Sequence, residues 1–146
     1  MDCLWVTKNG FIVAILIALS GCSLVSTSPY DSSADKAITK LHKQTAEFFA
    51  EFTKAVDKPE CGYSHHLPFY KNSKVSISSL LVRARAMADN DITVSQLELL
   101  SSSYAGLAQL HQLACLTPVQ VNELWVSFDT SFSAILKLEL AKKYGR

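Results

Sequence analysis

From position 34 to the end of the chain, apolar residues recur every three or four positions, which places them on one face of successive α-helices. The first helix is expected to start at a cap formed by Ser32 or Ser33 and to end at the segment 58–62, which contains a proline and a glycine. Its expected buried positions are Ile38, Leu41, Thr45, Phe48, Phe49, Phe52 and Val56.

A second helix is predicted from about Pro68, because proline is tolerated at the first position of a helix. Several serines make its first half a weak helix former. The positions expected to be buried are Phe69, Tyr70, Ile77, Leu80, Leu81, Ala84 and Met87.

The third and fourth helices have clearer starts. Thr93 with Gln96, and Thr117 with Gln120, both match the capping box, in which the two side chains satisfy each other's free backbone amides. In the third helix the expected buried positions are Val94, Leu97, Leu100, Tyr104, Leu107, Leu110 and Ala114. In the fourth they are Val121, Leu124, Trp125, Phe128, Phe132, Ile135, Leu136 and Leu140.

The end of the fourth helix also follows known preferences, with Lys142 and Lys143 in its last turn and Gly145 just beyond. No segment alternates between apolar and polar residues with a period of two, so we predict no sheet. Four helices joined by short loops favour an all-α fold, a four-helix up-down-up-down bundle over residues 34–146.

The composition agrees with one packed domain. The chain has 146 residues, of which 49% are hydrophobic and 18% charged, and this excludes a disordered protein. Its formal net charge is +1, so there is no broad basic field and nucleic acid is not an expected partner.

The N-terminal segment has a different character. Lys8 precedes an apolar run at positions 11–19, which is too short to cross a bilayer core of about 30 Å as a helix. The run ends in Leu19-Ser20-Gly21-Cys22, which resembles the lipobox of bacterial lipoproteins. That resemblance implies that residues 1–21 are a signal peptide and that Cys22 is acylated, palmitate being one such chain. An ordinary signal peptide or an N-terminal membrane anchor remains an alternative.

Ser23, rather than aspartate, follows the cysteine. In the sorting pattern of enterobacterial lipoproteins this resembles a protein of the outer membrane that faces the periplasm. Residues 22–33 are rich in serine, so we expect them to form a flexible tether between the lipid and the domain. With this anchor and one helical domain, the chain resembles in layout the small all-helical lipoproteins of Gram-negative envelopes.

The cysteines then predict one disulfide. Cys3 would be removed with the signal peptide and Cys22 acylated, which leaves Cys61 and Cys115. These two follow the first and third helices, so in an up-down-up-down bundle they lie at the same end. Because the envelope outside the inner membrane is oxidising, we expect them to pair.

Motifs for catalysis are absent from the sequence, which has no glycine-rich phosphate loop, no His-Glu-x-x-His and no Gly-x-Ser-x-Gly. We therefore expect a non-enzymatic protein without a cofactor. His42, Met87 and His111 could in principle hold a haem, but each is isolated, so packing or solvent contact is the better interpretation. The motif for covalent haem attachment, Cys-x-x-Cys-His, is missing.

One loop contains possible metal ligands. His65 and His66 lie close to Glu60 and Cys61, and zinc prefers imidazole and thiolate ligands. Adjacent histidines rarely converge on one ion, and a disulfide would remove Cys61 from the set. The alternative is a polar loop whose histidines cap the second helix.

The distribution of charge is unusual, because residues 86–136 contain no lysine or arginine. The third helix carries Glu98 as its single formal charge. A weakly charged surface loses its water at low cost and suits a contact with a protein partner or with a second copy of the chain. The expected contact residues are Leu99, Ser102, Ser103 and Gln109, and the loop with His65 and His66 is the alternative contact region. The alternative is that this helix is the most enclosed of the four.

Residues 116–120, Leu-Thr-Pro-Val-Gln, resemble the Leu-Thr-x-x-Gln pentapeptide of periplasmic envelope-stress chaperones, and residues 92–96 nearly repeat it. This resemblance implies binding of misfolded envelope proteins, although helix capping explains the same letters. The sequence thus predicts an outer-membrane lipoprotein that binds an envelope protein. A helical bundle for a small ligand or a metal, and a holdase chaperone, are the alternatives.

Overall fold

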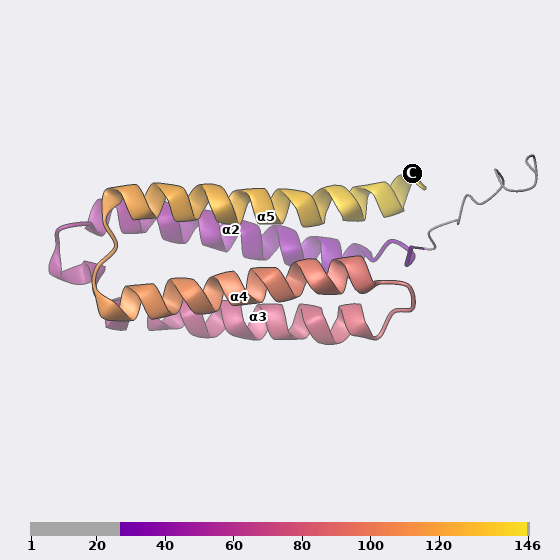
Figure 1. Cartoon of the computed structure of the whole chain (residues 1–146), viewed down its shortest axis with the longest axis horizontal. Coiled ribbons are helices and arrows are strands. Elements are labelled where there is room, and N and C mark those ends of the chain that lie inside the picture. The colour runs from indigo at the N-terminus through magenta and orange to yellow at the C-terminus, as the bar shows by residue number, and fades with distance from the viewer. Residues whose placement is uncertain (1–26, 146) are drawn as a thin grey trace, which may run out of the picture.

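The protein is built from four long antiparallel helices (Figure 1), in a computed structural model that describes residues 27–145. They are α2 (Ser32–Ala55), α3 (Leu67–Arg85), α4 (Asp91–Leu113) and α5 (Pro118–Tyr144). Each helix packs against two others, in the order α2, α3, α4, α5 and back to α2. The predicted all-α, up-down-up-down bundle is confirmed, and no strand occurs in the described part of the chain.

Two short 3-10 helices, η1 (Pro59–Cys61) and η2 (Tyr63–His66), connect α2 to α3. They form the distal end of the bundle together with the connection between α4 and α5 (Figure 1). We call the opposite end the base, where α2 begins and α5 ends. None of the helices within residues 27–145 combines the length and the apolar character needed to cross a membrane. The lipobox and Cys22 lie outside the described residues.

The core takes side chains from all four helices, as the apolar spacing predicts. Its largest fully buried apolar members are Phe52, Phe128, Phe132, Ile38, Leu41, Leu97, Leu100, Leu107, Leu116 and Ile135. Two of the expected positions are wrong. Ala114 is exposed because α4 has already ended there in extended backbone, and Leu140 is 45% exposed because the core stripe of α5 continues through Glu139 instead.

The helix starts agree with the sequence only in part. The capping box of α5 is confirmed, with the Thr117 amide donating to Gln120 at 2.8 Å and the Gln120 amide donating back to the Thr117 hydroxyl at 3.3 Å. The cap of α2 is Asp31, whose carboxylate accepts from the amide of Ser33 at 2.9 Å. An aspartate there replaces the expected serine because its charge also binds Arg83 on α3.

Thr93 is not the cap of α4, contrary to the second capping-box prediction. The helix begins two residues earlier, at Asp91, and Asn90 precedes it without a capping side-chain bond. The Thr93 side chain is buried and donates a hydrogen bond to Glu139 of α5 at 3.2 Å. The Thr93 hydroxyl, which the capping-box pattern assigns to the start of α4, instead joins α4 to α5.

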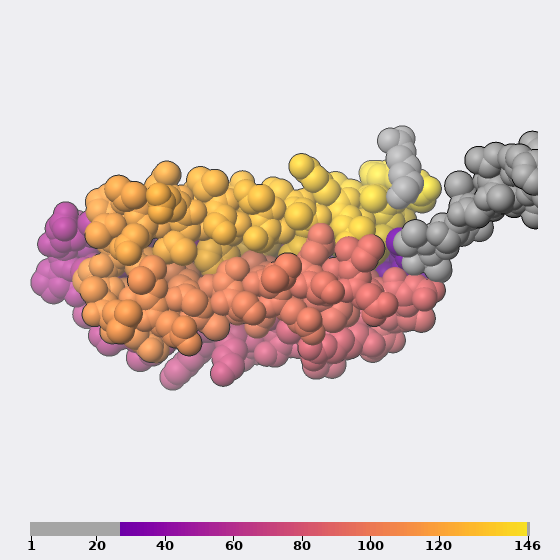
Figure 2. Space-filling model, viewed as in Figure 1, coloured from indigo at the N-terminus to yellow at the C-terminus, as the bar shows by residue number. Residues whose placement is uncertain are grey.

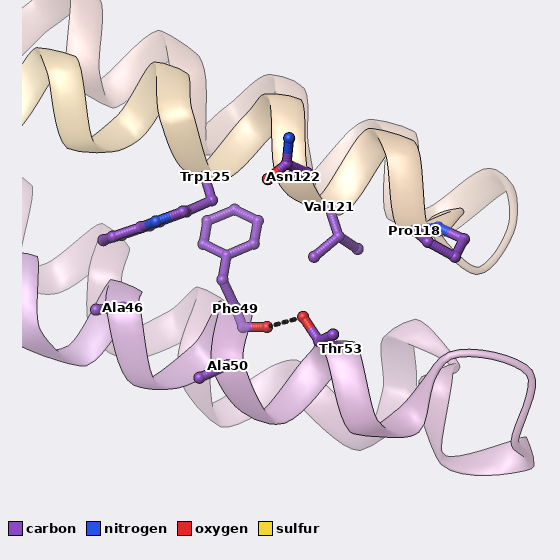
Figure 3. A pocket seen from close by; sticks show the side chains of 8 residues that line it. All are labelled: Ala46, Phe49, Ala50, Thr53, Pro118, Val121, Asn122 and Trp125. Carbon is purple, nitrogen blue, oxygen red and sulfur yellow. Dashed lines mark hydrogen bonds between the residues drawn. The ribbon is translucent and has the colours of Figure 1, made fainter.

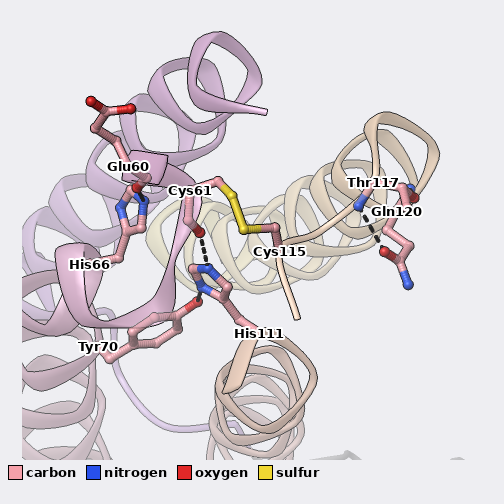
Figure 4. Close-up of a disulfide and its surroundings, with 8 residues drawn as sticks. All are labelled: Glu60, Cys61, His66, Tyr70, His111, Cys115, Thr117 and Gln120. Atoms are coloured by element: carbon pink, nitrogen blue, oxygen red, sulfur yellow. Dashed lines mark hydrogen bonds between the residues drawn. A yellow bond between two sulfur atoms is a disulfide. The ribbon is translucent and has the colours of Figure 1, made fainter. Parts of the chain in front are cut away.

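The predicted disulfide is confirmed. Cys61 in η1 and Cys115 after α4 are bonded at the distal end, with their Cα atoms 5.6 Å apart (Figure 4). The bond closes a loop that contains the whole of α3 and α4. In the chain-entropy description, a loop of this length restricts the unfolded state enough to stabilise the fold by about 4 kcal/mol.

Replacing both Cys61 and Cys115 by alanine should therefore lower the free energy of unfolding by about 4 kcal/mol, as measured by urea denaturation at neutral pH. Reduction of the wild-type chain should lower it by a similar amount, while the reductant should leave the double variant unchanged. A loss below about 1 kcal/mol would show that other contacts hold the distal end.

Candidate functional site

His111 lies at the centre of the distal end and is almost fully buried. Its Nε2 is 2.6 Å from the carbonyl oxygen of Cys61, so Nε2 carries the proton and donates (Figure 4). The Tyr70 hydroxyl then donates to Nδ1 across 2.6 Å. Burial lowers the pKa of His111, in agreement with a neutral ring. Because both nitrogens are occupied, this histidine is a packing element, as the sequence predicts.

The predicted metal cluster is not assembled. His66 Nε2 donates to the backbone carbonyl of Glu60 at 3.1 Å, and both His65 and Glu60 are exposed. The His66 ring packs on the rings of Phe48 and Phe52. Burial, and then the proximity of His111, lower the pKa of His66. Within residues 27–145, no three His, Cys, Asp or Glu side chains are grouped so that they could hold a metal ion.

His42 and Met87, the other two candidate haem ligands, do not lie together with His111. His42 Nε2 lies 2.8 Å from the Asp129 carboxylate, and its ring stacks on Trp125 with 5.8 Å between centroids. Met87 lies in the turn after α3 and is half-buried. These two residues and His111 sit in separate parts of the bundle.

The predicted contact surface does lie on the outside of the bundle. Leu99 is 70% exposed, Ser102 and Gln109 are exposed, and Ser103 is half-buried on the flank of α4. The two serine hydroxyls donate back to the carbonyl oxygens of Glu98 and Leu99, each at 3.0 Å. Each hydroxyl proton is therefore already hydrogen-bonded within the helix, so covering these serines removes fewer hydrogen bonds to water.

The exposure of α4 excludes the alternative that it is the most enclosed helix. About half of its residues are exposed, as in α2, and each of the two helices buries six. Figure 2 shows α4 and α5 side by side along one whole face of the molecule. Burial therefore does not explain why α4 has no lysine or arginine, because about half of its residues are exposed.

The structure extends this surface beyond the predicted residues. Ile92 and Leu113 lie near the two ends of α4 and are 51% and 84% exposed. Both are apolar residues that fall outside the spacing of the predicted core positions. Apolar residues off the core face of a helix are the sequence signal that could have identified them. We call Ile92, Leu99, Ser102, Gln109 and Leu113 the α4 surface.

A groove with a volume of about 380 Å³ lies between α2 and α5 near the distal end (Figure 3). The small side chains Ala46 and Ala50 form one wall, and Phe49 and Trp125 close one side. The hydroxyl of Thr53 donates to the Phe49 carbonyl at 2.8 Å. None of the described residues that line this groove is ionisable, so it offers an apolar surface without acid or base.

A buried polar network fills the base of the bundle, although Oε2 of Glu139 has no hydrogen-bond partner among the described residues. The ammonium group of Lys142 donates to Asn90 at 2.8 Å, to Thr93 at 2.6 Å and to Glu139 at 2.7 Å. The Lys142 and Glu139 side chains are only 5% and 2% exposed, so this is a buried ion pair with all three ammonium protons used. Lys142 thus lies in the last turn of α5, as the sequence predicts, and its ammonium group is buried there.

The same network fixes the chain before α2. The Ser28 hydroxyl donates to the Asn90 side chain at 2.7 Å, and the Ser28 amide donates to the Asp89 carbonyl at 2.9 Å. Ser28 is itself buried. Residues 28–31, which the sequence assigns to the flexible tether, are thus docked on the base, and α2 starts at Ser32.

Comparison with known proteins finds no matching family, no similar curated protein and no similar solved structure.

The folded state should lose stability as the pH falls below about 6.5, the usual pKa of histidine. Burial lowers the folded-state pKa of His111 and of His66, so the unfolded chain binds protons first and the loss continues as the pH falls through the folded-state values. We expect the double variant His66→Gln/His111→Gln to flatten this dependence between pH 7.5 and 5, relative to its own stability at pH 8. As a control, replacement of the exposed His65 by glutamine should leave the pH dependence of stability unchanged. If the double variant loses stability as steeply as the wild type, residues other than His66 and His111 cause the pH dependence.

Lys142→Met should lower the free energy of unfolding by about 3–5 kcal/mol, because it leaves the buried Glu139 carboxylate without its partner. Lys137→Met, at an exposed position of the same helix, should change it by less than about 0.5 kcal/mol. The double variant Glu139→Leu/Lys142→Met should recover most of the loss. Equal effects of the two single lysine variants, measured by thermal and urea unfolding, would contradict the role of the network.

Proposed function

We propose that this protein is a non-enzymatic lipoprotein of the outer membrane, facing the periplasm, that binds an envelope protein through the α4 surface. The observation that carries the proposal is the combination of exposure and weak charge on α4. The helix is as exposed as α2, yet the segment 86–136 contains no lysine or arginine. The lipobox and the formed disulfide support the assignment to the envelope.

The α4 surface has the properties of a contact surface for physical reasons. The cores of protein interfaces are poor in lysine and glutamate, since charged side chains lose much hydration energy on burial. Leu99 and Leu113 are exposed apolar side chains on this helix. Glu98 is held by Arg85 of α3 at 2.7 Å, and Ser102 is bonded back to the helix. A partner can therefore cover this surface with little loss of hydration.

The anchor that we propose also has a suitable length. Between an acylated Cys22 and the docked Ser28 the chain can extend about 20 Å at most, at about 3.3–3.6 Å per residue. The base would then stand close to the membrane, and α4, which is about 35 Å long, would extend away from it. In this orientation the α4 surface is open to a protein in the periplasm.

A photoreactive amino acid placed at Gln109 or Ser102 tests the contact in intact cells. We expect one adduct of defined mass from these α4 positions and little from Lys40 on α2, which lies diagonally across the bundle. Amine-reactive reagents are unsuitable because α4 has no lysine. The surface assignment fails if all three positions give the same mixture of abundant proteins.

Introducing negative charge at the contact gives the matching prediction. Ser102→Glu/Gln109→Glu should reduce adduct formation from a photoreactive residue at Leu113 by about tenfold, equivalent to about 1.4 kcal/mol of binding free energy. Lys40→Glu/Lys43→Glu on α2 is the control and should leave the yield unchanged. Both variants should keep the wild-type thermal midpoint within a few degrees, since all four positions are exposed. If the α4 charges leave the yield unchanged, the contact lies elsewhere.

The anchor itself is tested with Cys22→Ala. The variant should fail to incorporate labelled palmitate and should keep the precursor mass, because cleavage before position 22 requires the acylated cysteine. If the wild-type chain also incorporates no palmitate and keeps its precursor mass, an N-terminal membrane anchor is favoured instead.

A further inference from the structure

A second groove, with a volume of about 320 Å³, lies between α3 and α4 on another face of the bundle. It exists because α4 presents Ser101, Ala105 and Ala108, three small residues on one helical face, opposite the larger side chains of α3. The volume is at the lower end of the range of about 300–1,000 Å³ that is typical of small-molecule sites. Its lining residues extend over about two turns of each helix, from Tyr70 to Ile77 on α3 and from Ser101 to Ala108 on α4, so it suits an elongated occupant.

The floor of this groove is apolar and fixed in place. Tyr70 and Tyr104 are buried, and both hydroxyls are engaged, the first with His111 at 2.6 Å and the second with Thr45 of α2. Burial raises the pKa of Tyr104 to about 12, so it stays neutral. Tyr63 stacks on Tyr70 with 4.8 Å between ring centroids. Tyr70 and Tyr104 therefore offer ring surfaces to the groove, since their hydroxyl groups are bonded to partners inside the protein.

The rim of the groove is positively charged. Lys71 and Lys74 line it from α3, and they lie on the same side of that helix because they are three residues apart. Neither lysine forms an ion pair within residues 27–145. The opposite helix supplies no nearby carboxylate, since Glu98 is the last acidic residue of α4 and is bound by Arg85. Two cations thus border an apolar groove without a counter-charge.

From this combination we propose that the α3–α4 groove binds a single-chain anionic amphiphile, a medium-chain fatty acid. The alkyl chain would lie along Ala105 and Ala108 against the tyrosine rings, and the carboxylate would lie between Lys71 and Lys74. Burial of the alkyl chain against apolar surface supplies the driving force for binding. The two ammonium groups select an anionic head over a cationic or neutral one. The lining residues differ from those of the α4 surface, although Ala105 lies one turn from both Ser102 and Gln109, and the proposal does not depend on the proposed partner.

Decanoate tests the proposal by isothermal titration calorimetry below its micellar concentration. The protein is the mature chain with Cys22→Ala, which removes the lipid and the need for detergent, and with the disulfide intact. We expect saturable binding of one decanoate per chain. Decyltrimethylammonium, which has the same chain and a cationic head, should not bind saturably. Equal binding of the two would show unspecific adsorption to apolar surface and would overturn the proposal, as would the absence of saturable decanoate binding.

Two variants assign the site to the groove. Lys71→Gln/Lys74→Gln should weaken decanoate binding by at least about tenfold, and so should Ala105→Leu, which fills the groove at an exposed position. Lys40→Gln/Lys43→Gln removes two exposed lysines from α2 and should leave the affinity unchanged. Amide chemical-shift changes on binding should centre on Ser101 and Ala108. Unchanged affinity in both groove variants would contradict the assignment, whatever the outcome of the cross-linking experiments.

Discussion

The architecture depends on a double connection at the distal end. The disulfide joins Cys61 to Cys115, and His111, one turn earlier, donates to the carbonyl of Cys61 at 2.6 Å. The loop between α2 and α3 is thus held to the end of α4 both covalently and by a buried hydrogen bond. This connection fixes the distal end of α4 against the loop between α2 and α3, and α4 continues as one helix from Asp91 to Leu113, so its outer side is a continuous surface. The groove beside it is equally fixed, because Tyr70, which binds His111, forms its floor.

The base provides the second constraint. Lys142 is buried with Glu139 and also donates to Asn90 and Thr93, so that residues from α4, α5 and the turn before α4 share one set of hydrogen bonds. Ser28 joins the same set through Asn90. A buried ion pair contributes little to stability when compared with apolar packing, but it strongly penalises arrangements that separate its partners. Its effect here is to fix where the chain enters the bundle, and thus which end would face a membrane if Cys22 is acylated.

Local patterns in the sequence were sufficient for the helices, the Thr117 capping box and the disulfide, because these depend on spacing and on neighbouring residues. They were insufficient at the base. Thr93 fits a helix cap by its sequence, yet it is buried because Glu139, 46 residues away, and Lys142 take its hydroxyl. The apolar stripe favours Leu140 for the core, but the ion pair allows Glu139 to take that place. The groove between α3 and α4 was missed for a similar reason, since small residues on one helix reveal a cavity only when the opposite helix is known.

We propose that a protein partner in the envelope covers the weakly charged, exposed side of α4. Hydroxyl-radical footprinting measures this directly, because it reports the solvent access of leucine and valine side chains with and without the native surroundings. We predict that Leu99 and Leu113 are modified several-fold less in intact envelopes than in the purified protein, while Val75 on α3, which is 65% exposed, reacts equally in both. Equal modification of Leu99 and Leu113 in the two samples would contradict the account.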